Sequence, residues 1–232
     1  PSTKMVVRTI DTGGAGPISA LITGAQMIRQ EWADAVVIVA ADAVSSLDPD
    51  EFARRADASV AGSHTLPSPS IPNGYDRIAR WHMQKYGVTR EHLAMVPTIL
   101  SHFSSKHPNS LCKRPYKLDE VLSSHPVAEV TSTWECARRA DGAAAVVLAS
   151  ERHLKRNFAD RELRLCPSYV SGGEAAGPMY PPEFDEISED LFSCEKAARI
   201  AYRQAHLSSR DIDFWGLYDC FPICFLRALE AV

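Results

Sequence analysis

Apolar residues recur at helical spacing in a stretch near the start of the printed sequence. Pro17 stands where a proline fits the first turn of a helix, and the apolar side that follows is made of Ile18, Leu21, Ile22, Ala25 and Ile28. The spacing predicts a buried helix over 17–30. Residues 35–41 are apolar at every position, which predicts a central strand covered on both faces and followed by Asp42.

The middle of the chain reads as a loop and then two helices. Residues 62–74, GSHTLPSPSIPNG, are rich in proline and small polar residues, which predicts a loop or a boundary. Helical spacing returns over 75–87, where Gly87 closes the pattern, and over 89–106, where Thr89 is the expected cap. Residues 118–130 predict one helical turn that leads into an extended piece.

The last third alternates between strand and helix patterns. Residues 141–150 predict a second buried strand, and 163–173 a further strand that runs into a glycine turn. Residues 189–207 predict a long amphipathic helix, and 211–221 a strand that ends in a polar and aromatic cluster. Strands that alternate with helices predict an α/β fold.

Composition narrows the class of protein. The 232 residues are 45% hydrophobic, enough for one large domain or two small ones. Charges of both signs are interspersed and the net charge is -4, so we expect no nucleic-acid partner. The longest apolar run, AVVIVAA, is far too short to span a membrane, and the first residues show no signal-peptide pattern.

The cysteines are scattered, which favours free thiols in a reducing compartment over zinc or disulfides. Only Cys220 and Cys224 lie close together, and they do not form a CxxC pair. The six cysteines are Cys112, Cys136, Cys166, Cys194, Cys220 and Cys224.

Two places at the ends of predicted elements carry candidate chemistry, because α/β folds place their chemistry there. One is the glycine-rich helix entrance. The backbone N–H groups of Gly13, Gly14, Ala15 and Gly16 can hold a carbonyl oxygen or another anion, or the stretch is simply a tight turn. The other place is the cluster YDCF at 218–221.

Several separate stretches resemble the thiolase superfamily, in the family's own order, and most closely its sterol-carrier-protein type. They are KYGVTREHLAMV, HPNSLCKRPYKLDEVLSSHPVAEV, ECARRADGAAAVVLAS and AARIAYRQAHLSSRDIDFWGLYDCF, and the likeness runs over nearly the whole chain.

The resemblance implies a fold of two βαβαβαββ halves, with core helices between the sheets and a loop domain that helps bind coenzyme A. Residues 1–61 then correspond to the later part of the first half, 62–130 to the loop region, 131–159 to the return to the first half and 160–232 to the start of the second half. We expect the fold to be incomplete at both ends, since the family's GHP motif and its final cysteine motif do not occur after YDCF.

At the helix entrance the resemblance implies a nucleophilic cysteine, and this chain has none there. An ungapped count back from IRQEWADAVVIVAAD puts that position at Gly14, and a shift of one residue puts it at Gly13. No cysteine precedes Cys112. Because glycine has no side chain to acylate, the usual acyl-cysteine mechanism is not expected.

The second departure from the family is Tyr218, where HDCF or NEAF would begin with histidine or asparagine. Thiolase-like aldolases carry a tyrosine at this place, so the resemblance implies that Tyr218 is catalytic. A phenol donates a hydrogen bond, or acts as an acid and base if its pKa is lowered. The alternative is a packed tyrosine. Asp219 and Cys220 are expected to support the loop, and Cys136 to lie in the core.

Other polar residues are expected to be solvated or to cap helices, and no metal site is expected. The histidines His64, His102, His107 and His125 lack metal-ligand spacing. Four cations are candidates for the phosphates of coenzyme A: Arg77, Arg80, Lys85 and Lys113.

The leading hypothesis is an enzyme that makes or breaks a carbon–carbon bond next to a coenzyme A thioester, as an acyltransferase or a retro-aldol enzyme of lipid metabolism. The alternatives are a non-catalytic acyl-CoA-binding or assembly subunit, and an ordinary acyltransferase that uses a cysteine outside this chain. No bound cofactor is expected, with a coenzyme A thioester as substrate. The resemblance also implies a homodimer, an OB-fold companion protein, and a location in the cytoplasm or the peroxisome.

Overall fold

The chain divides into two compact units, each described here by itself. The computed structural model describes residues 5–58, 66–159, 170–175 and 186–232. Unit 1 is assembled from Pro1–Ala43, Ala140–Ala175 and Lys196–Asp211, and unit 2 from Val44–Arg139, Ala176–Glu195 and Ile212–Val232. The predicted division into halves and a loop region stays a prediction.

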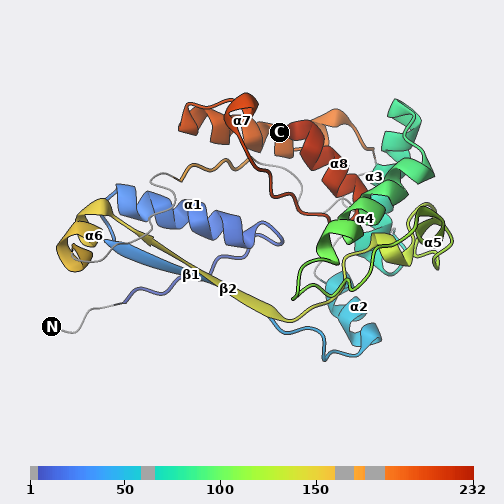
Figure 1. The fold of residues 1–232 in the computed structure, drawn as a ribbon, viewed down its shortest axis with the longest axis horizontal. Helices are drawn as coiled ribbons and strands as arrows, with labels where there is room; N and C mark the ends of the chain where they lie inside the picture. Colours follow the sequence, from blue (N-terminus) through green and yellow to red (C-terminus); the bar gives the residue numbers. More distant parts are fainter. Residues whose placement is uncertain (1–4, 59–65, 160–169, 176–185) are drawn as a thin grey trace. The chain divides into compact units, whose positions relative to one another are not determined.

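A helix on a pair of antiparallel strands forms the centre of unit 1 (Figure 1). Helix α1 (Gly16–Arg29) packs on β1 (Ala35–Asp42) and β2 (Gly142–Ala149), whose register runs from Ala35 opposite Ala149 to Asp42 opposite Gly142. A glycine permits the close approach, since a Cβ on Gly24 would lie 3.2 Å from Val36 and 3.3 Å from Leu148. The predicted helix over 17–30 and the strands over 35–41 and 141–150 are confirmed as elements. The burial predicted for 141–150 was wrong, because most of β2 is exposed among the described residues, and α1 is buried only in part.

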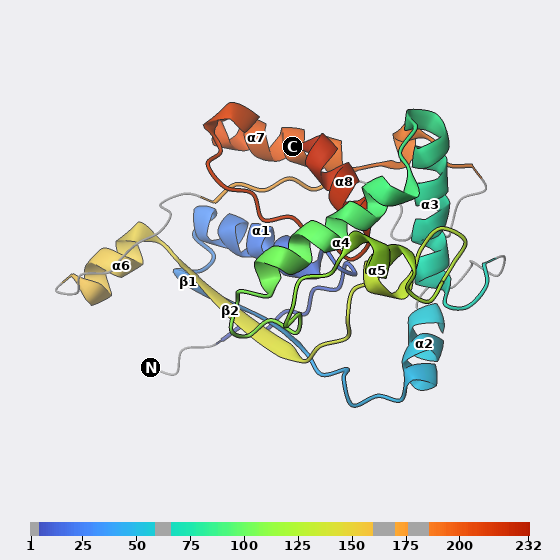
Figure 2. The ribbon, with the colours of Figure 1, turned by 45° about the vertical axis from the view of Figure 1, so that its right-hand side comes forward.

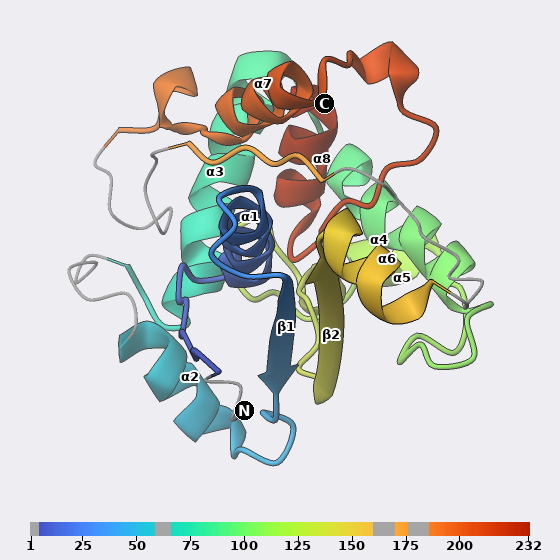
Figure 3. The same ribbon diagram turned by 90° about the vertical axis from the view of Figure 1, so that its left-hand side faces the viewer.

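Strand β1 is covered on one face, not on both as predicted. Within the described residues, α1 lies on the face that carries Val36 and Ile38, whereas Val37 and Val39 on the other face are 64% and 66% exposed. Figure 3 shows α1 on one side of the strand pair. A strand that is apolar on both faces is expected to be buried on both faces, but the pattern does not identify the elements that cover each face.

Unit 1 also contains α6 (Glu151–Phe158) and most of α7 (Cys194–Ala205), with a 3-10 turn at Ser209–Asp211. Helix α6 lies between the strands predicted over 141–150 and 163–173, where no helix was predicted. Its start is fixed by Ser150, whose side chain accepts a hydrogen bond of 3.1 Å from the N–H of His153.

Unit 2 is mainly helical (Figure 2). Its helices are α2 (Pro49–Ala58), α3 (Ser70–Tyr86), α4 (Arg90–Ser104), α5 (Leu118–Leu122) and α8 (Pro222–Ala231), with 3-10 turns at Thr133–Glu135 and Glu189–Leu191. The buried apolar cluster joins α3, α4 and the start of α8, and consists of Ile78, Ala79, Leu93, Phe221 and Ile223.

The predicted ends of α3 and α4 are confirmed. Gly87 ends α3 in the left-handed conformation (φ 70°), and Thr89 caps α4 by accepting a hydrogen bond from the N–H of His92. The start of α3 was predicted wrongly, because the helix begins at Ser70 inside the expected loop 62–74. Pro72 lies in the first turn of α3, where its missing N–H costs nothing.

Two buried carboxylates fasten the segment 130–135 to α3 and α4. Asp76, 1% exposed, accepts hydrogen bonds from the N–H of Val130 (2.8 Å) and the hydroxyl of Thr131 (2.9 Å). Glu135 receives both terminal nitrogens of Arg90, at 2.6 and 2.8 Å. A bidentate ion pair between the half-buried Arg90 and the buried Glu135 holds the segment against α4.

The later part of the chain departs from prediction in two places. Residues 213–220 contain no strand, so the strand expected over 211–221 was wrong; α8 begins directly after it. The helix expected over 189–207 is shorter, with a 3-10 turn before α7. Of the strand expected over 163–173, residues 163–169 lie outside the described residues and 170–173 are irregular.

Among the described residues, no helix combines the length and the apolar character needed to cross a membrane.

Candidate functional site

The last two residues of the YDCF segment are anchored where it meets α8. The carbonyl of Cys220 accepts a hydrogen bond of 3.0 Å from the N–H of Ala137. Phe221, in an extended conformation (φ -144°, ψ 153°), is the N-cap of α8, and its buried ring stacks on Tyr75 of α3 with centroids 4.7 Å apart. The chain is thus anchored from Cys220 onward, two positions after Tyr218.

Tyr218 itself projects from this anchored segment and is 69% exposed. Partial desolvation raises its pKa above the ordinary value, and the neighbouring Cys220 and Asp219 add to the effect. The condition considered above, a lowered pKa, is therefore not met. The phenol is neutral at physiological pH and can act as a hydrogen-bond donor or a general acid.

The two residues expected to support Tyr218 differ from each other. Asp219 is exposed, and its side chain makes no hydrogen bond within the part of the chain that the structure describes, so its supporting role stays a prediction. Cys220 is half-buried, and its backbone is tied to Ala137 as described above.

Three titratable side chains pack against the apolar cluster of unit 2 beside the YDCF segment: Tyr75, Cys220 and Cys224. The neighbouring Cys224 thiol lowers the pKa of Cys220, whereas Cys220 and burial raise the pKa of Cys224. Burial also raises the pKa of Tyr75.

The glycine-rich turn before α1 uses part of its own hydrogen-bonding capacity. The N–H of Gly13 donates to the carboxylate of Asp11 (3.1 Å), and the N–H of Gly16 donates to the carbonyl of Gly13 (3.0 Å). The expectation of four free amides was therefore wrong for Gly13 and Gly16. For Gly14 and Ala15 the anion-binding role stays a prediction.

Gly13 and Gly14 differ in backbone conformation and in the space available for a side chain. Gly13 has a φ of 61°, in the left-handed region that favours glycine. Gly14 is outside that region, and a Cβ built on it meets no described atom within 4 Å. The turn thus needs a glycine at Gly13, whereas Gly14, the position matched by the ungapped count, faces open space.

Three of the four candidate phosphate-binding cations have partners in unit 2. Arg80 pairs with Asp76 (3.0 Å) and Glu129 (2.6 Å), and Lys85 pairs with Glu189 (3.1 Å). The ammonium of exposed Lys113 donates to the carbonyl of Pro108 (3.2 Å). Lys113 is therefore the candidate with no carboxylate partner among the described residues, while for Arg77 the phosphate-binding role stays a prediction.

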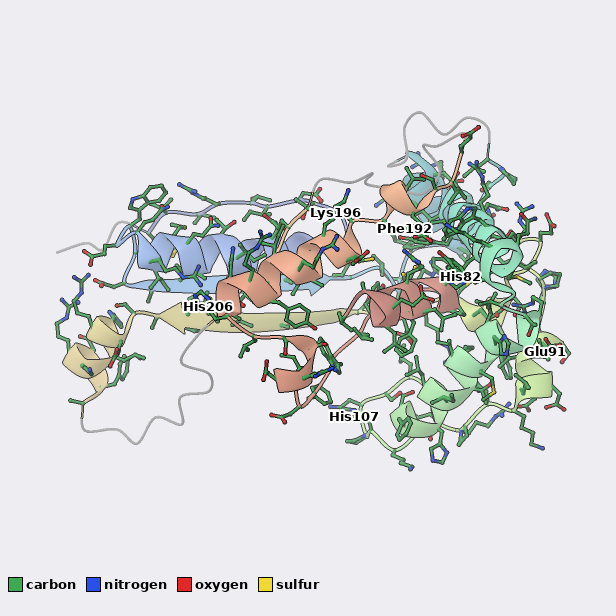
Figure 4. All side chains as sticks on the ribbon, turned by 90° about the horizontal axis from the view of Figure 1, so that it is seen from above. His82, Glu91, His107, Phe192, Lys196 and His206 are labelled. Carbon is green, nitrogen blue, oxygen red and sulfur yellow. The ribbon has the colours of Figure 1, made fainter. Side chains whose placement is uncertain are left out.

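The described histidines that were expected to be solvated are exposed. His102, His107 and His125 are exposed, whereas His64 lies outside the described residues. His82, which was not singled out, is buried on α3 and bonds Glu230 of α8 through Nε2 at 3.1 Å; Figure 4 labels His82 and His107. In the described ranges, no group of three His, Cys, Asp or Glu side chains could hold a metal ion.

Burial raises the pKa of Cys136 to about 11, and its thiol donates to the carbonyl of Ser132 at 3.5 Å. It packs against the apolar cluster of unit 2, so its assignment to the core is confirmed.

Sequence reasoning missed the contact between Tyr75 and the YDCF segment, in which Tyr75 stacks on Phe221. Tyr75 lies in α3, far from YDCF in the sequence, and reads as an ordinary member of an apolar helix face.

Comparison with known sequences gives matches along the whole chain. A family model described as "Thiolase C-terminal domain-like" matches residues 185–232. An acetyl-CoA acetyltransferase of Methanothermobacter thermautotrophicus is 30% identical over 233 residues, with 99% of this chain and 57% of the relative covered. Sterol carrier protein 2 of Bos taurus is 31% identical over 172 residues, with 72% of this chain and 30% of the relative covered. The chain thus spans about half or less of the length of these relatives.

Solved structures show the same fold. The "Ltp2-ChsH2(DUF35) aldolase" matches with a TM-score of 0.75 at 22% identity, covering 95% of this chain and 57% of that one. The acetyl-CoA acetyltransferase of Syntrophomonas wolfei matches with a TM-score of 0.68 at 17% identity, covering 96% of this chain and 62% of that one. At such low identity the likeness establishes a thiolase-like α/β fold, of which this chain covers part.

Proposed function

Since this chain belongs to the thiolase superfamily, we propose that it makes or breaks a carbon–carbon bond next to a coenzyme A thioester, without a covalent acyl-cysteine. The observation that carries the proposal is the pairing of two features: glycine stands where the nucleophile would be, and Tyr218 presents a neutral, exposed phenol. The names of the relatives, acetyl-CoA acetyltransferase and an aldolase, support this class of reaction.

Retro-aldol cleavage suits a site that has a proton donor and no nucleophile. When the bond between Cα and Cβ of a β-hydroxyacyl thioester breaks, the β-hydroxyl gives its proton to solvent water and becomes a carbonyl, and the electrons of the broken bond pass to Cα and the thioester carbonyl, giving an enolate. The phenol of Tyr218 then delivers a proton to that enolate, a role that requires the protonated form. The amides of Gly14 and Ala15 are proposed to bind the thioester oxygen.

The test is cleavage of a β-hydroxyacyl-CoA by full-length protein, with Tyr218→Phe as the variant. General acid catalysis is worth roughly 100-fold or more, so we expect kcat to fall by about that factor. Tyr86→Phe is the matched control, because Tyr86 is similarly exposed (50%) and lies in the same unit. Equal activity of the two variants would remove Tyr218 from the mechanism.

A non-catalytic acyl-CoA-binding or assembly subunit is the second candidate. It is favoured by the internal hydrogen bonds of Gly13 and Gly16, which leave fewer donors for an oxyanion. If the protein binds acyl-CoA but shows no turnover with or without a companion protein, this function replaces the first. Loss of turnover after treatment with iodoacetamide would instead point to an acyltransferase that uses a thiol.

The proposed partners are a second copy of the chain and a small OB-fold companion. The companion is supported by a structural neighbour whose name pairs Ltp2 with ChsH2(DUF35). A cytoplasmic or peroxisomal location is proposed on the family resemblance. Light scattering of the purified protein, alone and with candidate companions, measures the assembly directly.

A further inference from the structure

Helix α4 (Figure 2) carries large apolar side chains on its outward face. Met95, Ile99 and Phe103 follow one another at intervals of four residues, so they lie on one side of the helix. Among the described residues they keep between 39% and 63% of their surface exposed. The opposite side of α4 packs into unit 2 through buried Leu93 and Val96. A helix at the surface of a globular protein ordinarily carries polar side chains on its outward face, so this apolar face indicates a contact.

The sequence around this face carries positive charge and no negative charge. The 27 residues from 92 to 118 include four lysines and arginines and no aspartate or glutamate, although the whole chain has a net charge of -4. Arg114 is paired with Glu120 at 2.8 Å. The other three cations are exposed and form no ion pair in the part of the chain that the structure describes: Lys106, Lys113 and Lys117.

Contacts bring the lysines and the apolar side chains together at the end of α4. The ammonium of Lys106 lies 5.6 Å from the ring centroid of Phe103. The segment 110–116 folds back along the helix, since the N–H of Tyr116 donates to the hydroxyl of Ser101 at 2.8 Å. We call the basic-apolar surface the exposed side chains of α4 and this segment, namely Met95, Ile99, Phe103, Lys106, Leu111 and Lys113.

The chemistry of the basic-apolar surface favours a membrane over a protein as its occupant. A bilayer with anionic lipids presents a negative surface above an apolar interior, so it complements the lysines and the apolar side chains at once. Interfaces between proteins are enriched in arginine and depleted of lysine. Here the cations without a carboxylate partner are all lysines, whose long stems let the ammonium groups stay at the head groups while the apolar side chains go deeper.

We propose that the basic-apolar surface docks the protein reversibly on an anionic lipid bilayer, with α4 lying parallel to the membrane. The apolar side chains enter the boundary between head groups and acyl chains, and the lysines contact the lipid phosphates and carboxylates. This inference goes beyond the proposed function and does not depend on it.

The test is co-sedimentation of full-length protein with lipid vesicles. One set consists of phosphatidylcholine, and the other also contains about 30% phosphatidylserine. We expect the affinity for the anionic vesicles to exceed that for the neutral ones by more than about tenfold at about 50 mM salt. At about 0.5 M salt the difference should nearly disappear, because salt screens the attraction between lysines and lipids.

Variants at exposed positions separate the two contributions. Lys106→Gln should weaken binding to anionic vesicles about fivefold, with Lys196→Gln as the control, an exposed lysine of unit 1. Phe103→Asn should weaken binding about tenfold, because an apolar ring no longer enters the boundary. Its control is Phe214→Asn, since Phe214 is 83% exposed and lies in the same unit.

The wild-type measurement alone can decide against the proposal. Full-length protein that sediments with neither kind of vesicle, or equally with both at low salt, would overturn it, and so would equal effects of Phe103→Asn and Phe214→Asn. If Phe103→Asn instead changes the assembly measured by light scattering while no vesicle is bound, the surface is a contact between proteins and the membrane proposal is wrong.

Discussion

At the scale of single residues, the two adjacent glycines of the helix entrance have different reasons to be glycine. Gly13 is required by its backbone, with a φ of 61°, whereas Gly14 has an ordinary backbone and open space around its Cβ position. The open position, Gly14, is the one that the ungapped count matches to the family's nucleophile, and a shift of one residue would match Gly13 instead. Backbone strain therefore does not explain why position 14 is a glycine and not a cysteine.

The first prediction compares alanine at the two positions. Gly13→Ala should lower the free energy of unfolding by about 1 kcal/mol, because a Cβ is strained in the left-handed region. Gly14→Ala should change it by less than about 0.5 kcal/mol. Urea unfolding of both variants checks this, and equal midpoints would contradict the assigned backbone conformations.

Tyr218 leads to a prediction about pH. Its pKa lies above the ordinary value of about 10, so the phenol keeps its proton throughout the neutral range. A reaction that needs this proton should therefore show a kcat that is independent of Tyr218 ionisation below about pH 10 and that falls as the pH rises beyond it. A decline centred below pH 9 that disappears in Tyr218→Phe would show that the pKa is lowered instead.

At the scale of elements, predictability follows the strength of local signals. The cap at Thr89, the left-handed Gly87 and the apolar side of 17–30 are local, and the helices that they define are confirmed. The prediction of a strand over 211–221 was wrong because a strand forms only beside another strand, and the local sequence does not show whether one is present. In the sheet that the structure describes, β1 and β2 pair with each other. For the same reason Tyr218 was found from its motif, while the stacking of Phe221 on Tyr75, which comes from a distant helix, was not.

The attachment of α3 to the segment 130–135 leads to the next prediction. Asp76→Ala should lower the free energy of unfolding by about 2–4 kcal/mol, because the N–H of Val130 and the hydroxyl of Thr131 lose their buried acceptor. Glu51→Ala on α2 is the control, since its ion pairs with Arg54 and Arg55 lie at the surface and should have little effect. Both are measured by denaturant titration; equal shifts would show that the Asp76 contacts do not hold the segment.

At the scale of the whole molecule, the fold is established and the activity is a proposal. The chain spans 57% of the acetyl-CoA acetyltransferase that it matches, so the proposed reaction belongs to the complete protein. Binding is the property that both proposed functions share. It is therefore the first whole-molecule property to measure.

Acyl-CoA should raise the melting temperature of full-length protein, and the rise should continue with the logarithm of ligand concentration above the Kd. A ligand at 100 times its Kd adds about 2.7 kcal/mol to the stability of the folded state. Thermal unfolding with increasing acyl-CoA, and with the corresponding free fatty acid as a control, checks this. A melting temperature that responds to neither, or equally to both, would contradict recognition of the coenzyme A thioester.

The antiparallel pairing of β1 with β2 also has a consequence for how the chain reaches its native state. Nearly all the sequence between the two strands, from Val44 to Arg139, belongs to unit 2. Bringing the strands together closes a loop of about 100 residues, an entropic cost of about 4 kcal/mol beyond the constant part. During synthesis, at roughly 5–20 residues per second, β1 waits about 5–20 s for its partner. Throughout that interval its backbone is an open template, and the intervening helices can fold before the strand is paired.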